Sequence, residues 1–328
     1  MPKLLVAVAV LCLAACLDPA EDGNLVPRTA DEDPSIPQLS FNGSTFHLQT
    51  FGDPSAPVIV VLHGGPGGDY RGLLRLRDPV NGVRLEDRHL LVFWDQRGTG
   101  LSQRHPASEI TNAAYDQDLS WIIDRFSPGR PVVLLGHSWG GMYASRYISL
   151  HPEKIAGAVL MEPGPLTGAL YSEVRSHMFE FDLLSEWLND YAWAQSIVSP
   201  DGHARADYLR AQGMLAHAVQ PGYHEANADR AQFGRLGAVA AAAVLEEGMV
   251  DGEPVWDFTR GLDRFPVPVL FEASTDNTVI GIAFQQRQMR FYANASLAVV
   301  AGAGHDFPWT RPAETVAPVL SYLDSIGF

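Results

Sequence analysis

Three side chains of this sequence have the types and the chain order that nucleophilic acyl transfer needs: Ser138, Asp276 and His305. A serine hydroxyl is a weak nucleophile at neutral pH, so it needs an adjacent imidazole base, which a carboxylate must orient. His305 would take the proton from Ser138 and pass it to the leaving group. Asp276 would hold the imidazole ring and stabilise its positive charge. The predicted chemistry is therefore hydrolysis through an acyl-enzyme.

Ser138 lies in the hexapeptide Gly-His-Ser-Trp-Gly-Gly at 136–141. An apolar run at 131–135 precedes it, and the helical spacing of 142–148 follows it. A Gly-x-Ser-x-Gly sequence between a strand and a helix predicts a sharp turn that lifts the serine hydroxyl clear of the sheet. The two flanking glycines leave room where side chains would collide.

The predicted base and acid each follow a later strand. His305 comes after the apolar run 295–300 and a loop of small residues, and Asp276 comes after the apolar run 267–272. In folds that carry a nucleophile on such a turn, the acid and the histidine follow in that chain order. Glu162 is the alternative acid, because it directly follows the preceding predicted strand.

The tetrahedral intermediate of acyl transfer carries an oxyanion, which needs N–H donors already in place. Trp139 supplies one backbone N–H, because it stands directly after the nucleophile at the start of the predicted helix. The glycine-rich sequence His-Gly-Gly-Pro-Gly-Gly at 63–68 follows a buried strand at 57–62. Its glycines allow a close approach of the backbone, and Gly65 is the predicted second donor.

The arrangement of apolar runs and helical segments predicts an α/β fold, with a mostly parallel central sheet flanked by helices. Residues 39–163 and 264–328 form the predicted core. Between them, residues 164–263 have mainly helical spacing, which predicts an inserted helical cap. Asn42-Gly43, between alternating apolar residues, predicts a hairpin at the sheet edge.

Residues 1–15 have the features of an export signal, since Lys3 precedes an apolar stretch that is too short to span a bilayer. Leu-Ala-Ala-Cys at 13–16 resembles the lipobox of bacterial lipoproteins, which implies cleavage before Cys16 and acylation of that residue. An ordinary secretory signal peptide is the alternative. The acidic, proline-broken segment 16–38 predicts a tether. We therefore expect an exported lipoprotein anchored to a membrane, at the outer membrane or its periplasmic face.

The formal net charge of −15 argues against nucleic acid as a partner. The two cysteines are Cys12 and Cys16, so the mature chain would have neither a disulfide nor a thiolate metal site. Histidines and carboxylates with the spacing of metal ligands are not found on any predicted helix. Acyl transfer by a serine needs no cofactor, and we expect neither a metal nor a cofactor.

Three motifs together resemble the proline iminopeptidase branch of the α/β-hydrolases. They are the glycine-rich sequence at 63–68, Trp-Asp-Gln-Arg-Gly-Thr-Gly-Leu-Ser at 94–102, and the hexapeptide at 136–141. The resemblance covers the predicted core and implies removal of an N-terminal residue, often proline, from short peptides. It also implies that cap glutamates bind the free α-amino group. Glu246 and Glu247 are candidates for that role, and Glu186, in a reversed Glu-Trp pair, is another.

Two other functions fit the same sequence. A carboxylesterase or another small-molecule acyl hydrolase would use the same three residues, and this reading gains if Glu246 and Glu247 point to solvent. The third possibility is a lipoprotein that binds a ligand without catalysis, which the complete set of Ser138, Asp276 and His305 argues against.

Overall fold

The computed structural model describes most of the chain. The described residues fall into four ranges: 26–178, 202–217, 222–224 and 234–328. The predicted export signal, the lipidation site at Cys16 and the candidate Glu186 lie outside these ranges. Within them, none of the helices has both the length and the apolar composition that crossing a membrane requires.

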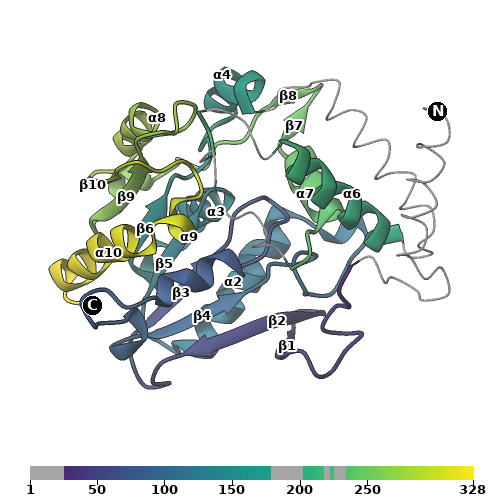
Figure 1. Cartoon of the computed structure of the whole chain (residues 1–328), viewed down its shortest axis with the longest axis horizontal. Coiled ribbons are helices and arrows are strands. Elements are labelled where there is room, and N and C mark those ends of the chain that lie inside the picture. The colour runs from purple at the N-terminus through teal and green to yellow at the C-terminus, as the bar shows by residue number, and fades with distance from the viewer. Residues whose placement is uncertain (1–25, 179–201, 218–221, 225–233) are drawn as a thin grey trace, which may run out of the picture.

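The centre of the described structure is an eight-stranded sheet (Figure 1). Its strands lie in the order β1-β2-β4-β3-β5-β6-β9-β10. β2 pairs antiparallel with β1 and β4, and the pairs from β4 to β10 are parallel. This confirms the predicted α/β fold. The strands are β1 Gln38–Phe41, β2 Ser44–Phe51, β3 Val58–Leu62, β4 Leu90–Trp94, β5 Val132–His137, β6 Ile155–Met161, β9 Val269–Ser274 and β10 Ala295–Val300.

The strands β1 and β2 form the hairpin expected at one edge of the sheet. Asn42 and Gly43 at its tip have φ angles of 45° and 70°. A two-residue turn of this kind needs positive φ at both central residues, and asparagine and glycine adopt it at the lowest cost. The prediction of an edge hairpin is confirmed.

Helices cover both faces of the sheet, so its central strands are buried on both sides. All five residues of β3 are buried. Val58, Val60 and Leu62 pack on the side of α2 and α3, whereas Ile59 and Val61 pack on the side of α10. The helices of the described residues are α2 Asn112–Phe126, α3 Trp139–Leu150, α4 Gly168–Met178, α6 Gly202–His217, α7 Ala238–Glu247, α8 Ile282–Gln288, α9 Phe307–Thr310 and α10 Pro312–Ile326.

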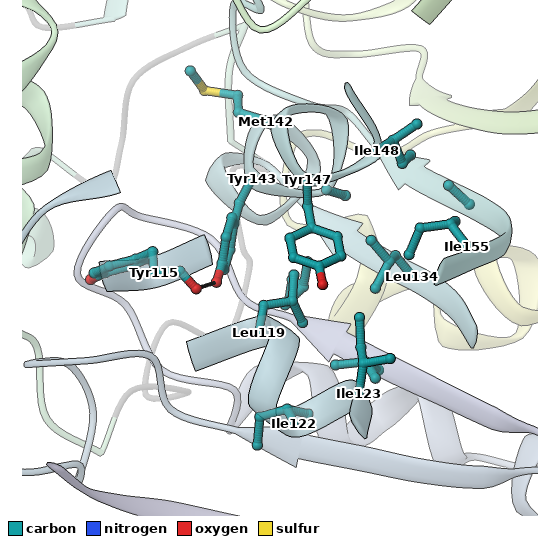
Figure 2. Packing of buried hydrophobic residues seen from close by; sticks show 14 of the residues in the cluster. Tyr115, Leu119, Ile122, Ile123, Leu134, Met142, Tyr143, Tyr147, Ile148 and Ile155 are labelled. Carbon is teal, nitrogen blue, oxygen red and sulfur yellow. Dashed lines mark hydrogen bonds between the residues drawn. The ribbon is translucent and has the colours of Figure 1, made fainter. Parts of the chain in front are cut away.

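Packing between α2 and α3 fixes the helix that begins directly after Ser138. Figure 2 shows Leu119 and Ile123 of α2 lying beside Tyr147 of α3 and Leu134 of β5, all in one buried cluster. Each fully buried leucine or isoleucine side chain contributes about 1.5–3 kcal/mol to folding. The Tyr147 hydroxyl also lies 2.8 Å from the hydroxyl of Ser120 in α2. These contacts hold α3 against α2 and β5.

The region predicted as a cap contains α4, α6, α7 and a short hairpin of β7 (Met249–Val250) and β8 (Glu253–Pro254). The spacing of the sequence gave no sign of this hairpin. Figure 1 shows α6 and α7 side by side, and the two helices are in contact. Asp207 of α6 is buried and accepts hydrogen bonds from Arg104, Arg235 and the N–H of Ala238. This carboxylate links both helices to the core.

The cap also contacts the glycine-rich loop at 63–68. The Arg210 side chain donates a hydrogen bond to the Pro66 carbonyl over 2.8 Å. The N–H of Gly237 donates to the Gly67 carbonyl, also over 2.8 Å. A side chain at position 67 would lie 2.4 Å from the Gly237 carbonyl oxygen, so only glycine allows this approach. Hydrogen bonds from the cap therefore hold the loop that is predicted to bind the oxyanion.

The prediction of a tether over the whole of 16–38 is wrong for its second half. Thr29 and Ala30 are buried, and the Ala30 N–H donates to the Leu101 carbonyl over 2.7 Å. The Pro27 carbonyl accepts a hydrogen bond from Arg235 over 2.7 Å. The acidic composition indicated a solvated segment, but these contacts attach it to the core and the cap.

Candidate active site

Ser138 occupies the turn between β5 and α3. Its backbone has φ 55° and ψ −117°, a strained conformation that costs about 1–3 kcal/mol and forms the predicted sharp turn. A side chain at Gly136 would lie 2.4 Å from the Gly140 carbonyl oxygen, and one at Gly140 would lie 2.0 Å from that of Leu62. The Ser138 N–H donates to the Met161 carbonyl of β6 over 3.0 Å. The glycines and this bond together explain the sharp turn.

His305 is buried and forms a hydrogen-bonded pair with Glu162. Its Nδ1 atom lies 2.8 Å from Oε2 of the carboxylate, and the two side chains are 6% and 0% exposed. A carboxylate accepts hydrogen bonds, so Nδ1 carries the proton in the neutral ring. Nε2 is then the nitrogen that can take a proton from a nucleophile.

Glu162 follows β6 directly and has a φ of 40°, which turns the chain at the end of the strand. Its Oε1 atom accepts from the N–H and the hydroxyl of Ser274, over 2.7 and 2.6 Å. Its Oε2 atom accepts from the Asn277 amide over 2.7 Å as well as from His305. These donors satisfy a carboxylate that burial would otherwise penalise.

The prediction that Asp276 is the acid is therefore wrong, and the alternative, Glu162, takes that place. Asp276 is exposed, and its carboxylate accepts a hydrogen bond from the Thr275 hydroxyl over 2.8 Å. The loop after β9 instead contributes neutral donors, Ser274 and Asn277, to the carboxylate that leaves β6. Both acids were candidates because each follows an apolar strand, and these two strands, β6 and β9, are neighbours in the sheet.

Tyr223 joins Ser138 to His305. Its phenol is hydrogen-bonded to the side chain of Ser138, and the ring centroids of Tyr223 and His305 lie 4.6 Å apart. The structure therefore brings Ser138, His305 and Glu162 into one site, with Tyr223 over them. Tyr223 was not predicted, since nothing in its local sequence indicates a position in the site.

His137, directly before Ser138, holds the main chain of His305. Its Nε2 atom donates to the His305 carbonyl over 3.0 Å, and the two rings have centroids 4.6 Å apart. Burial, and next the charge of His305, lowers the pKa of His137 well below its ordinary value. A neutral ring can pack against His305 without competing for the proton.

The glycine-rich loop approaches the nucleophile from the end of β3. A side chain at Gly64 would lie 3.1 Å from Cβ of Ser138. Gly65 has a φ of 129°, and its N–H donates no hydrogen bond to another described residue. Trp139 is the first residue of α3, so its N–H has no acceptor within that helix. The oxyanion role of Gly65 and Trp139 stays a prediction.

The motif at 94–102 fixes the glycine-rich loop against the nucleophile turn. The Gln96 side chain donates to the His63 carbonyl over 3.1 Å and accepts from the Trp139 indole over 3.0 Å. His63 Nδ1 donates to the Gly64 carbonyl over 2.9 Å. Burial lowers the pKa of His63, so its ring stays neutral in this network. The motif therefore has a positioning role.

The two glutamates predicted to bind an amine lie elsewhere. Glu246 and Glu247 are both exposed at the end of α7. Glu247 accepts a hydrogen bond from the N–H of Asn112 over 2.6 Å, at the start of α2. A carboxylate there satisfies an end of the helix that carries partial positive charge. That prediction is wrong, because the exposed end of α7 is not part of the site.

The arrangement defines a class of protein, a hydrolase built on an α/β sheet with a nucleophile on a strand-to-helix turn. The family model described as alpha/beta hydrolase fold matches residues 57–312. The chain belongs to this family.

Relatives of the chain include hydrolases of several specificities. It is 26% identical over 278 residues to the putative carbamate hydrolase RutD of Caulobacter sp. (strain K31), covering 80% of this chain and 94% of that protein. It is 24% identical over 296 residues to the proline iminopeptidase of Lactobacillus helveticus (strain DPC 4571), covering 88% and 97%. The solved esterase EaEST from Exiguobacterium antarcticum has the same fold, with a TM-score of 0.62 and 17% sequence identity. The match covers 87% of this chain and 97% of that chain.

Proposed function

We propose that this hydrolase acts through an acyl-enzyme formed on Ser138, with His305 as the base and Glu162 as the residue that orients it. The observation that carries the proposal is the buried Glu162–His305 pair beside the nucleophile turn. Ser138 Oγ bonds to the acyl carbon while its proton passes to Nε2 of His305. The bond to the leaving group then breaks, and the same proton goes to the departing atom. A water molecule then attacks the acyl carbon with His305 again as the base. The bond to Ser138 breaks, the proton returns to the serine, and the carboxylic acid is released.

The proposed substrate is a short peptide with a free N-terminus, from which one residue is released. The three core motifs support it, as does the similarity to a proline iminopeptidase over 97% of that protein's length. The acyl group of such a substrate is the N-terminal amino acid.

The substrate proposal predicts turnover of proline and alanine p-nitroanilides with a free amino group. The matched control substrate is the N-acetylated anilide, which has the same scissile bond without the ammonium group. We expect its kcat/KM to be at least about 100-fold lower, since a site built for a polar group rejects an analogue lacking it. Turnover of p-nitrophenyl esters with no turnover of either anilide would eliminate the peptidase.

A small-molecule ester hydrolase is the second candidate. The exposure of Glu246 and Glu247 favours it, since neither carboxylate is in place to bind an amine. In that case the esters would be cleaved, and acetylation of an α-amino group on the acyl part would change kcat/KM by less than about threefold, because no polar contact would be lost.

We also propose that Cys16 carries lipid that holds the enzyme at a membrane. Lipid chains contribute about 0.8 kcal/mol of membrane affinity for each buried methylene, so losing them should release the protein. Cys16→Ser is expected to abolish incorporation of labelled palmitate and to move the protein to the soluble fraction. Cys12→Ser, inside the predicted signal, is the matched control and should keep both. Membrane retention of unlabelled Cys16→Ser would contradict the proposal.

A further inference from the structure

Three consecutive residues of the cap, 222–224, are each bound to the loops that surround His305. The Gly222 carbonyl accepts from the N–H of Thr278 over 2.7 Å. The Tyr223 carbonyl accepts from the N–H of His305 over 2.7 Å. His224 Nδ1 lies 2.8 Å from the Asp306 carboxylate. These contacts fix Tyr223 relative to the histidine that it covers.

Glycine at position 222 makes this approach feasible. Its φ is 79°, a conformation that side chains rarely adopt. A Cβ atom there would lie 2.6 Å from the Thr278 hydroxyl oxygen. The backbone on the N-terminal side of Tyr223 therefore lies directly on the loop after β9.

The phenol of Tyr223 lies at the reacting centre. It is hydrogen-bonded to the Ser138 side chain, while its ring packs on that of His305 with centroids 4.6 Å apart. The residue is only 8% exposed. When the acyl-enzyme forms, the leaving-group atom lies between the nucleophile and the base, because His305 must return the proton to it. A hydroxyl that contacts Ser138 beside His305 can reach that atom.

We propose that Tyr223 is a catalytic residue whose phenol hydrogen-bonds the leaving-group atom of the substrate while the bond from that atom to the acyl carbon breaks. An ester oxygen accepts this hydrogen bond, whereas the N–H of an amide donates to the phenol oxygen. His305 supplies the proton that the leaving atom keeps, and Tyr223 retains its own. This inference rests on the proposed acyl-enzyme function but applies to peptides and esters alike.

Burial of Tyr223 suits this role. Burial, and next the negative charges of Glu162 and Asp306, raises the pKa of Tyr223, so the phenol stays protonated. A neutral phenol can donate and accept a hydrogen bond, and it brings no charge into a site that already holds the Glu162 carboxylate.

The test compares two esters with the same acyl group, ethyl acetate and p-nitrophenyl acetate. Ethoxide is strongly basic, so its departure depends on a hydrogen bond to the leaving oxygen. p-Nitrophenolate is weakly basic and departs without such a hydrogen bond. Loss of one hydrogen bond in Tyr223→Phe is expected to lower kcat/KM about tenfold for the ethyl ester. For the p-nitrophenyl ester we expect a change of less than about twofold, because bond breaking no longer limits the rate.

The matched control is Tyr171→Phe in α4, whose ring packs on Trp256, and it should leave both rates unchanged. Rates are expressed per active site, with the sites counted by titration with a fluorophosphonate. Misfolded molecules are then not counted and do not lower the measured rate. An equal loss on both esters, or no loss on either, would overturn the role of Tyr223. A wild-type protein that cleaves neither ester and takes up no fluorophosphonate would instead overturn the proposed function.

Discussion

Ser138→Ala is expected to lower kcat by about a millionfold on any substrate that the wild type cleaves. The alanine side chain has no oxygen to bond to the acyl carbon, so the His305–Glu162 pair has no nucleophile to activate. In other serine hydrolases, removing the nucleophile costs this much and leaves a residual rate that comes from binding and the oxyanion donors alone. The fold should be retained, since alanine keeps the Cβ atom that packs beside Gly64.

Two measurements check this prediction. The kcat of the purified variant is compared with that of the wild type, and covalent labelling by a fluorophosphonate is followed on both. The control is Ser149→Ala in the same helix, where the hydroxyl donates only to the Arg146 carbonyl. We expect normal labelling of Ser149→Ala and none of Ser138→Ala. A Ser138→Ala variant that keeps a tenth of the activity would show that another residue is the nucleophile.

The buried strands and the nucleophile turn were predictable because their signals are local. Continuous apolar runs such as 58–62 are typical of strands covered on both faces. The glycines around Ser138 mark a turn that no other residue type tolerates. His305 was found for a similar reason, since it follows a strand and a loop of small residues. In each case the residues that carry the signal are neighbours in the chain.

The choice between Glu162 and Asp276 was not local. Each follows an apolar strand, and the outcome depends on the positive φ at Glu162 and on donors from Ser274 and Asn277, more than a hundred residues away. Tyr223 was missed for the same reason, because its place depends on contacts with the loops after β9 and β10. Glu247 was a candidate because the family resemblance implies glutamates in the cap, but its hydrogen bond with the Asn112 N–H places it at the start of α2.

Glu162→Gln is expected to lower kcat about 10,000-fold, whereas Asp276→Asn should change it by less than about twofold. In a related triad, the amide replacement of the acid costs this much, because the histidine adopts the wrong tautomer. Here both oxygens of Glu162 accept from donors on each side. The glutamine side chain has one oxygen and one NH₂ group in place of the two carboxylate oxygens. In either orientation, the NH₂ group therefore faces groups that now donate hydrogen bonds to Glu162.

If that NH₂ group faces His305, Nδ1 must accept its hydrogen bond and the ring proton moves to Nε2. Nε2, the nitrogen that would act as the base in the proposed mechanism, then carries a proton and cannot take the one from serine. If the NH₂ group faces Ser274 instead, it meets the backbone N–H that now donates to Oε1, which costs about 1–3 kcal/mol and disturbs the loop. Asp276 is the matched control because it is an exposed acid whose carboxylate accepts from the Thr275 hydroxyl.

The kcat values of the two single variants and the double variant are measured together, with thermal unfolding to confirm that each is folded. If Glu162 alone orients the base, the double variant should be no slower than Glu162→Gln. A large loss in Asp276→Asn with near-normal turnover in Glu162→Gln would assign the role to Asp276. That outcome would require the loop after β9 to move, because His305 Nδ1 now lies 2.8 Å from the Glu162 carboxylate.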